Sequence, residues 1–307
     1  MLRIIGDTNI DFIGMRKKAF ILSALFLIVG LGAFTMIILN KANMGIDFAG
    51  GTMIQGNFEQ PISIGSLRDA VIGSGFTDAS IQALERHNVP NSFIVRVKET
   101  KVDDMDAAER LLQIINESFA GNTFHLDSEH IIGPAVGESL KRDAQWAVFI
   151  SVLGMIIYIG LRFDFRSGVA ATIATFHDVL VVLGILLILD KELTLLVVTA
   201  LLTLAGYSLT DTVVVYDRIR ENLKKFRGKG QFVGTVNKSI NEVLSRTIMT
   251  SLTSLTVVVI ILIFGGEVLR DFALALTIGI VVGTYSSVFV ASPVIVEWEA
   301  RSPKRFK

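Results

Sequence analysis

The stretch Leu201–Tyr216, LLTLAGYSLTDTVVVY, places a carboxylate inside a run of residues that otherwise suits a lipid bilayer. An aspartate at the centre of a membrane helix costs roughly 2.5–3.5 kcal/mol by insertion measurements. Such a residue needs a partner, a proton or a water-filled cavity to offset this cost. Asp211 therefore predicts a membrane protein that transports a solute or moves protons.

The composition of the whole chain indicates the same class of protein. Of its 307 residues, 51% are hydrophobic and 19% are charged, whereas soluble domains carry about 25% charged residues. The formal net charge is zero, so nothing points to a nucleic acid as a partner. The chain has no cysteine, and its four histidines are not spaced as zinc ligands, so we expect neither a metal nor another cofactor.

Six apolar stretches are long enough to cross a membrane, because a bilayer core needs about 20 apolar residues per helix. They cover residues 19–39, 144–161, 168–189, 193–215, 247–264 and 273–296. The first stretch follows a basic tail at 1–18, as the apolar part of a signal peptide would. It is long for a signal peptide, and five more spans follow, so we expect it to be a retained helix.

The basic residues outside the spans predict their orientation, because cytoplasmic loops carry an excess of lysine and arginine. Basic residues gather in four segments: 1–18, 162–167, 218–246 and 297–307. The loops 190–192 and 265–272 hold one basic residue each. Both termini are therefore expected in the cytoplasm, with 40–143 as one external domain. Residues 144–296 are expected to hold the other five spans and a cytoplasmic amphipathic segment at 218–245.

Segment 40–143 is expected to form an α+β domain, because its hydrophobic pattern changes between strand and helix periodicity. The expected elements are strand 52–59, helix 63–73, strand 79–85, strand 92–97, helix 104–119 and strand 123–132. The order βαββαβ is that of the ferredoxin-like split motif. We also expect a turn at 88–91, and a cap at Asp103 or Asp104 for the second helix.

Two polar groups lie inside the spans in addition to Asp211. His177 and Asp178 fall about nine residues into the third expected span, where they form either a structural pair or a relay. Arg246 and Thr250 open the fifth span and lie four residues apart, so they share one face of a helix. A polar stripe of this kind normally faces other helices or a water path.

Asp211 and Arg246 are both expected on the cytoplasmic side of the membrane, at similar depths. An ion pair between them would offset part of the cost of burying the carboxylate. The alternatives are an Arg246 that only anchors the end of its span, and an Asp211 that is only a hydrogen-bonded structural residue. Asp217 is expected at the solvated end of the fourth span more readily than in a proton path.

Two further segments have a simple interpretation. Segment 231–245 has the spacing of a short amphipathic helix, with its apolar residues on the membrane surface. Together with the basic residues just before it, this segment is expected to contact anionic lipid or to dock a protein partner. In the sixth span, Gly279 and Gly283 predict tight helix packing rather than a ligand site.

Five motifs occur at defined places relative to the spans. They are GIDFAGGT at 45–52, IGPAVG at 132–137, His177-Asp178, GYSLTDTVVVYDRIREN at 206–222 and RTIMTS at 246–251. The match that they carry covers essentially the whole chain. They resemble the SecF group of the SecD/SecF family of bacterial protein-export subunits, which belongs to the resistance-nodulation-division superfamily.

The resemblance implies a multi-span subunit of the cytoplasmic membrane and not an enzyme. Such subunits act with SecD beside the SecYEG channel, with YajC and YidC as further partners. They use the proton gradient to assist the export of unfolded preprotein. The family gives functional weight to the positions of Asp211, Arg246 and Thr250. The first motif is expected to serve backbone geometry through Gly45, Asp47, Gly50, Gly51 and Thr52.

One mechanistic hypothesis follows, in which protonation of Asp211 releases Arg246 and lets the helices shift. His177, Asp178 and Asp217 are secondary candidates for the proton path. The alternatives are an exporter of lipid or small molecules, an intramembrane aspartyl protease and a purely structural subunit. Exporters of this superfamily generally carry larger domains and a doubled set of spans. No protease motif accompanies the aspartates.

Overall fold

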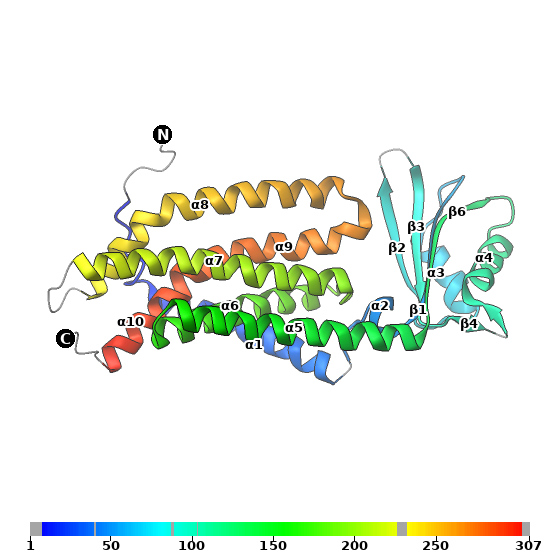
Figure 1. Ribbon diagram of the computed structural model, residues 1–307. Coiled ribbons are helices and arrows are strands. Elements are labelled where there is room, and N and C mark those ends of the chain that lie inside the picture. Colours follow the sequence, from blue (N-terminus) through cyan, green and yellow to red (C-terminus); the bar gives the residue numbers. More distant parts are fainter. Residues whose placement is uncertain (1–7, 40, 87–88, 103, 226–231, 303–307) are drawn as a thin grey trace. The chain divides into compact units, whose positions relative to one another are not determined.

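The computed structural model describes residues 8–39, 41–86, 89–102, 104–225 and 232–302. The chain divides into two compact units, a helical unit and a small α+β unit (Figure 1). The helical unit comprises Met1–Asn43, Val148–Lys191 and Leu196–Lys307, and the small unit comprises Met44–Ala147 and Glu192–Leu195.

Six helices in the described part of the chain are long and apolar enough to cross a membrane, which confirms the expected number. They are α1 (Arg16–Ile38), α5 (Pro134–Arg162), α6 (Phe165–Ile188), α7 (Leu195–Lys225), α8 (Phe232–Phe264) and a sixth span, Val268–Arg301. The sixth span is irregular. In it, α9 (Gly266–Ser286) passes through a π-helical turn, η1 (Ser287–Ala291), into α10 (Ser292–Arg301).

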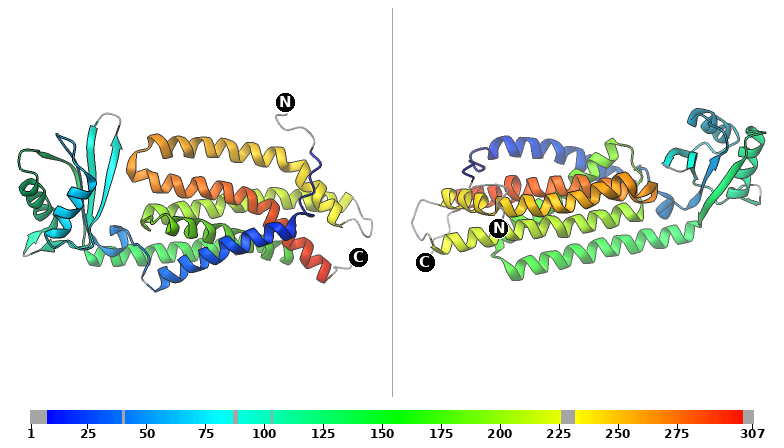
Figure 2. Two further views of the ribbon diagram at one scale, coloured as in Figure 1. Left: turned by 180° about the vertical axis from the view of Figure 1, so that it is seen from behind. Right: turned by 90° about the horizontal axis from the view of Figure 1, so that it is seen from above.

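The helices of this unit differ in how far they are covered by their neighbours. Within the most apolar 18-residue stretch of each helix, the buried share is 50% in α6, 44% in α7 and 56% in the sixth span. The corresponding fractions for α1, α5 and α8 are 17%, 6% and 17%. The outer helices therefore present apolar faces that suit lipid or another subunit. α8 and α9 run antiparallel as a pair (Figure 2).

α1 and α6 approach each other closely at two glycines. A Cβ built at Gly30 of α1 would lie 2.3 Å from the carbonyl oxygen of Leu180, and one at Gly184 of α6 would lie 2.8 Å from Gly30 N. In a bilayer, helices gain little from the hydrophobic effect between them, and small residues let their backbones pack by van der Waals contact. The absence of a side chain at these two positions is therefore what allows the contact.

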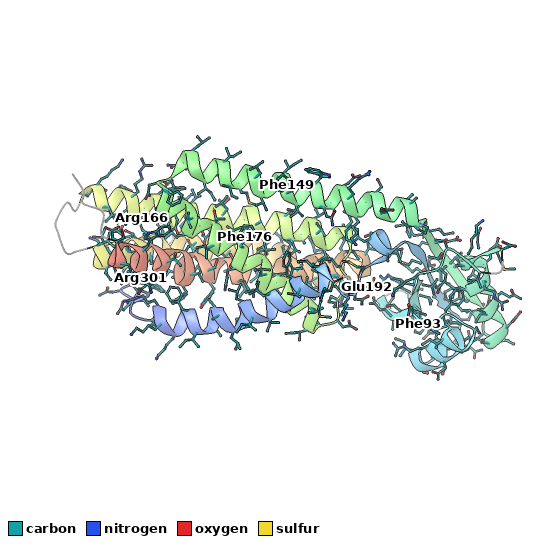
Figure 3. All side chains as sticks on the ribbon, turned by 90° about the horizontal axis from the view of Figure 1, so that it is seen from below. Phe93, Phe149, Arg166, Phe176, Glu192 and Arg301 are labelled. Atoms are coloured by element: carbon teal, nitrogen blue, oxygen red, sulfur yellow. The ribbon has the colours of Figure 1, made fainter. Side chains whose placement is uncertain are left out.

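One end of the helical unit is held by ion pairs between different helices. Arg16 Nε lies 2.7 Å from Glu297 Oε1, which ties α1 to α10. Arg166 Nη1 lies 2.5 Å from Glu299 Oε2, which ties α6 to α10, and Arg166 and Arg301 lie at this same end (Figure 3). Partly exposed pairs contribute about 0–1 kcal/mol each, so their main effect is to fix which helix ends stand together.

The residues before α1 pack against α8. The side-chain amide of Asn237 accepts a hydrogen bond from the N–H of Phe12 at 2.9 Å and donates one to the carbonyl of Ile10 at 2.9 Å. Asn241 accepts from the N–H of Ile10 at 2.9 Å. Phe12 is 5% exposed and Ile13 is fully buried. The two asparagines thus satisfy backbone groups of an irregular segment while its apolar residues enter the core.

The prediction of a separate short helix at 231–245 is wrong, because α8 is one unbroken helix from Phe232 to Phe264. Residue 231 lies outside the described residues. Val236 and Ile240 are fully buried and share a core with Ile219 of α7. The apolar face of this segment is therefore packed inside the protein and not on the membrane surface. Hydrophobic spacing predicts a helix, but it does not distinguish a membrane from a neighbouring helix as the covering surface.

The small unit is a four-stranded antiparallel sheet with α3 and α4 packed on one face (Figure 1). Its elements are α2 (Ile46–Ala49), β1 (Gly51–Phe58), α3 (Ile64–Gly73), β2 (Ser80–Arg86), β3 (Val89–Val97), β4 (Lys101–Val102), β5 (Met105–Asp106), α4 (Ala107–Ser118) and β6 (Phe124–Ile132). The strand order β2-β3-β1-β6 confirms the expected ferredoxin-like arrangement. The hairpin β4–β5 is an addition that the sequence did not predict.

The core of the small unit forms between the sheet and its two helices. Leu67 and Val71 of α3 and Leu111 and Ile115 of α4 are fully buried, as their helical spacing predicts. On the sheet, Ile54 is fully buried beneath them. These side chains give the unit a hydrophobic core of its own.

The start of α4 and the turn before β3 differ from expectation. Asp106 holds the N-cap position of α4 without a side-chain cap bond, and Asp104 has φ 65° and precedes β5. Asp104 is therefore not the cap, and Asp103 lies outside the described residues. β3 begins at Val89, so residues 89–91 are strand and not turn, while residue 88 lies outside the described residues.

The first glycine motif forms the entry to β1. Gly50 and Gly51 have φ values of 75° and 135°, as expected for residues without a Cβ. A Cβ at Gly51 would lie 2.2 Å from the carbonyl oxygen of Val97, so a side chain is excluded there. Thr52 is fully buried, and its hydroxyl donates to the carbonyl of Glu99 at 2.9 Å.

Gly45 and Asp47 hold the segment 192–195 within the same unit. The N–H of Gly45 donates to the carbonyl of Leu193 at 3.0 Å. Asp47 Oδ2 accepts from the N–H of Leu195, the first residue of α7, at 2.9 Å. A carboxylate suits this place, because the first N–H groups of a helix have no partner inside it and carry partial positive charge.

Gly30→Val is expected to lower the stability of the protein by roughly 1–3 kcal/mol, because the added side chain would enter the backbone of α6. Gly32→Val is the matched control, since a Cβ at Gly32 meets no described atom within 4 Å. Thermal unfolding of the full chain in detergent should give a lower Tm for Gly30→Val and little change for Gly32→Val. Equal melting temperatures for the two variants would contradict the close contact between α1 and α6.

Candidate functional site

Asp211 lies half-buried on α7, where this helix meets the sixth span. Ser287, the first residue of η1, donates its hydroxyl to Asp211 Oδ2 at 2.6 Å. Thr247 of α8 is 2% exposed, and its hydroxyl lies near the Asp211 carboxylate without reaching hydrogen-bonding geometry. Asp211 is thus approached by neutral hydroxyls from two other spans.

Arg246 does not pair with Asp211 in this structure, so the prediction of an ion pair between them is wrong here. Arg246 is exposed, and it forms no ion pair with any other residue that the structure describes. Successive residues of an α-helix stand about 100° apart around its axis. Because Thr247 is turned inward, its neighbour Arg246 is turned outward, which explains the difference.

Thr250 lies on the same exposed face of α8 as Arg246, as their spacing predicts. Its hydroxyl donates to the carbonyl of Arg246 at 2.9 Å, and the hydroxyl of the exposed Thr253 donates to the carbonyl of Met249 at 3.0 Å. These threonines are satisfied within their own helix. On this stripe, Arg246 is a cation without an ion-pair partner in the described part of the chain, and the hydroxyls around it need no outside partner.

A second buried carboxylate lies on α6. Asp178 has no exposed surface, and His177 is 6% exposed. His177 Nδ1 lies 2.9 Å from Asp178 Oδ1, while Asp178 Oδ2 accepts hydrogen bonds from Ser286 at 2.5 Å and from Ser208. His177 Nε2 is buried and has no hydrogen-bond partner among the described residues. The pair expected from the sequence is thus part of a larger cluster that joins α6, α7 and α9.

Two consecutive serines link this cluster to Asp211. Ser286 donates to Asp178 and Ser287 donates to Asp211. The two carboxylates therefore bind different hydroxyls across the α9–η1 junction. They do not form the shared dyad of an aspartyl protease, in which two carboxyl groups lie against each other and share one proton.

The backbone at this junction is irregular, and side chains satisfy it. Pro293 has no N–H and cannot continue the ladder of helical hydrogen bonds. The hydroxyl of Ser292 donates to the carbonyl of Ser287 at 2.9 Å, and that of Tyr216 donates to the carbonyl of Ala291 at 3.0 Å. Single π-helical turns are rare and occur often at functional sites.

Asp217 lies apart from both carboxylates and has a partner on α5. Arg162 Nη2 lies 2.8 Å from Asp217 Oδ1 and 2.6 Å from Asp217 Oδ2. Their side chains are 39% and 41% exposed, respectively. This geometry gives Asp217 the role of a tie between α5 and α7 near the basic end of the helical unit.

Gly279 and Gly283 lie against α7, which confirms the packing interpretation of this motif. A Cβ at Gly279 would lie 2.6 Å from the side chain of Leu204, and one at Gly283 would lie 3.3 Å from Ser208. α9 therefore comes close to α7 one turn before Ser286 and Ser287. This close approach brings the two serines within reach of the carboxylates.

The residues that sequence reasoning missed carry hydroxyl groups. They are Ser208, Thr247, Ser251, Ser286 and Ser287. Ser251 joins α8 to α9 through Thr284 at 2.7 Å and accepts from Tyr207 of α7 at 3.2 Å. Ser208 lies in the motif that contains Asp211, Thr247 and Ser251 lie in the motif that begins with Arg246, and the other two serines follow Gly283. A single hydroxyl residue in a span does not by itself indicate a site. In the described part of the chain, no group of His, Asp and Glu side chains is arranged to hold a metal.

Comparisons with known proteins agree with the motifs. The family model "Protein export membrane protein SecD/SecF, C-terminal" matches residues 113–301. A protein translocase subunit SecF from Thermodesulfovibrio yellowstonii is 49% identical over 296 residues, which is 96% of each chain. The SecF of Endomicrobium trichonymphae is 39% identical over 311 residues, which cover 100% of this chain and 96% of that one.

Two solved structures of SecDF resemble this fold at 36% sequence identity. The translocon-associated SecDF of Thermus thermophilus gives a TM-score of 0.82 over 96% of this chain. SecDF in a "Super-membrane-facing form" gives 0.70 over 97%. This chain spans 39% and 40% of those two chains, respectively. On the family match and the identity to SecF subunits over nearly its whole length, the chain belongs to the SecF group of the SecD/SecF family of protein-export membrane proteins.

Proposed function

We propose that this chain works with a separate SecD beside SecYEG and uses the proton-motive force to assist preprotein export across the cytoplasmic membrane. The family supports the assignment to protein export. The solved SecDF chains are named for both subunits, which supports an association with SecD. YajC and YidC are the further partners that the family suggests.

The observation that carries this proposal is the set of neutral partners around Asp211. A fixed cation would hold the carboxylate in its ionised form, whereas a hydroxyl serves both forms. Ser287 Oγ lies 2.6 Å from Asp211 Oδ2 and 3.0 Å from the carbonyl oxygen of Thr284. It can donate to an ionised Asp211, or donate to Thr284 and accept from a protonated Asp211. The contact between Ser287 and Asp211 can therefore persist when Asp211 takes up a proton.

Arg246 allows a second arrangement of α8 in the proposed cycle of proton uptake and release. It stands next to Thr247 on α8, with its guanidinium exposed and unpaired among the described residues. A rotation of α8 by about 100° would put Arg246 where Thr247 now lies, beside an ionised Asp211. Protonation of Asp211 would remove the attraction and return α8 to the arrangement described here. One of the two solved SecDF structures is named for a "Super-membrane-facing form", which supports more than one arrangement of that protein.

The free energy available from one proton is sufficient for such a switch. A charge that crosses the membrane gains about 2.3 kcal/mol per 100 mV, which corresponds to about a fiftyfold change in an equilibrium constant. The proposed direction of uptake is from the outside, with both termini in the cytoplasm. The basic residues at the end of the helical unit that carries Arg16, Arg166 and Arg301 support this orientation.

Asp211→Asn is expected to remove the stimulation of export by a proton gradient, because the amide does not titrate. The measurement is preprotein export into inverted membrane vesicles that contain SecD and this chain, with and without an imposed gradient. Asp190→Asn is the matched control, because Asp190 is exposed and has φ 51°, a conformation that asparagine also adopts readily. Normal stimulation in the Asp211→Asn vesicles would refute proton coupling through this residue.

Arg246→Met is expected to reduce gradient-dependent export by about tenfold while leaving the melting temperature nearly unchanged, since surface substitutions usually alter stability by less than about 0.5 kcal/mol. Arg220→Met, at another exposed position near the end of α7, serves as the control and should export within about twofold of wild type. If both variants behaved alike, Arg246 would be only an anchor at the end of its span.

A further inference from the structure

One oxygen atom of Asp178 joins two of the inner helices. Asp178 Oδ2 accepts the hydroxyl of Ser208, which lies on α7, and the hydroxyl of Ser286, which ends α9. All three residues have no exposed surface. The other oxygen, Oδ1, is taken by His177 of the same helix at 2.9 Å. Only Oδ2 therefore bridges different helices, and it bridges α7 to α9 through α6.

This bridge stands directly beside the contact between Asp211 and Ser287. Ser208 precedes Asp211 by three residues, so the two lie on the same side of α7. Ser286 immediately precedes Ser287. The helices that Asp178 Oδ2 holds together are thus the two that must be in register for Ser287 to donate to Asp211.

The need for such a bridge follows from the irregular backbone at this point. Ser287 opens a π-helical turn, in which each residue is rotated and shifted relative to an α-helix. The hydroxyl of Ser286 is held by Asp178 at 2.5 Å and lies 3.1 Å from the carbonyl of Gly283. Anchoring the last α-helical residue fixes where the turn begins, and hence where the Ser287 hydroxyl points.

We propose that Asp178 is a positioning residue for Asp211: it aligns α7 with the α9–η1 junction so that Ser287 donates to the Asp211 carboxylate. This role rests on the proton-coupled function proposed above. It requires an acceptor at Oδ2 and does not require that Asp178 change its charge. Asp178 therefore differs from a relay residue, which must take up and release a proton.

The difference between positioning and relay predicts the effect of a neutral isostere. In Asp178→Asn, the carboxamide oxygen can accept both serine hydroxyls, and the amide N–H can donate to Nδ1 of His177. Asp178→Leu keeps a side chain that branches at Cγ but has no hydrogen-bond acceptor. A positioning role predicts that the asparagine variant works and the leucine variant does not, whereas a relay predicts that both fail.

The experiment measures gradient-dependent export in vesicles that contain SecD and the full chain, with membrane content and Tm recorded for every variant. Asp178→Asn should stay within about threefold of wild type, and Asp178→Leu and Ser286→Ala should each lose about tenfold, as expected when a buried hydrogen bond is lost. Ser287→Ala should lose a similar factor. The double variant Ser286→Ala/Ser287→Ala should lose no more than the worse single variant, within about twofold, because Ser286→Ala acts by misplacing the contact between Ser287 and Asp211 that Ser287→Ala removes.

Ser239→Ala is the matched control for burial, because Ser239 is also fully buried and contacts Asn222 and Thr235 but neither carboxylate. It should keep wild-type export. The positioning role is overturned if Asp178→Asn fails as completely as Asp178→Leu while its Tm is normal, or if the losses from Ser286→Ala and Ser287→Ala multiply. Should Asp178→Leu not fold, the serine variants decide the question. Asp211→Asn tests the proposed function separately. If it loses gradient stimulation, proton coupling through Asp211 stands, and the Asp178 and serine variants then decide only the positioning role.

Discussion

The hydrogen bond from Ser287 to Asp211 is the interaction around which the helical unit is arranged. A carboxylate in this environment needs a partner, and the partner here is neutral. For the serine to reach it, the sixth span must approach α7 closely and change its helical geometry at the point of contact. Gly279, Gly283 and the π-helical turn meet these requirements.

The distribution of burial agrees with this arrangement. The inner elements, α6, α7 and α9–η1, carry both carboxylates and the serines that bind them. The outer helices α1 and α5 contribute mainly apolar surface, and α8 brings Thr247 inward and Arg246 outward. A change in the charge of Asp211 would therefore act first on the contacts between α7, α8 and the sixth span, while ion pairs at one end of the unit keep the helix ends together.

The sequence was sufficient for the architecture and only partly sufficient for the site. Hydrophobic run length predicted six spans, and alternating periodicity predicted the βαββαβ unit, because both patterns are repeated over many residues. Asp211 was recognisable because a charge in a span is rare. Its partner was not, since Arg246 and Thr247 are adjacent and only the rotation of α8 decides which of them faces inward. Ser286 and Ser287 were also missed, because the π-helical turn that aims them depends on tertiary contacts. The apolar face of segment 231–245 was misplaced for the same reason, as its covering surface is another helix.

In the proposed cycle, Asp211 itself takes up and releases a proton while its hydroxyl partner remains in place. Difference infrared spectroscopy of the full chain with SecD in lipid tests this most directly, by comparing low and high pH in wild type and Asp211→Asn. Protonation of Asp211 should give a carboxylic-acid C=O band at low pH that is absent in Asp211→Asn and changes frequency in Ser287→Ala. A wild-type spectrum without a band that depends on Asp211, across the pH range in which the gradient drives export, would contradict it.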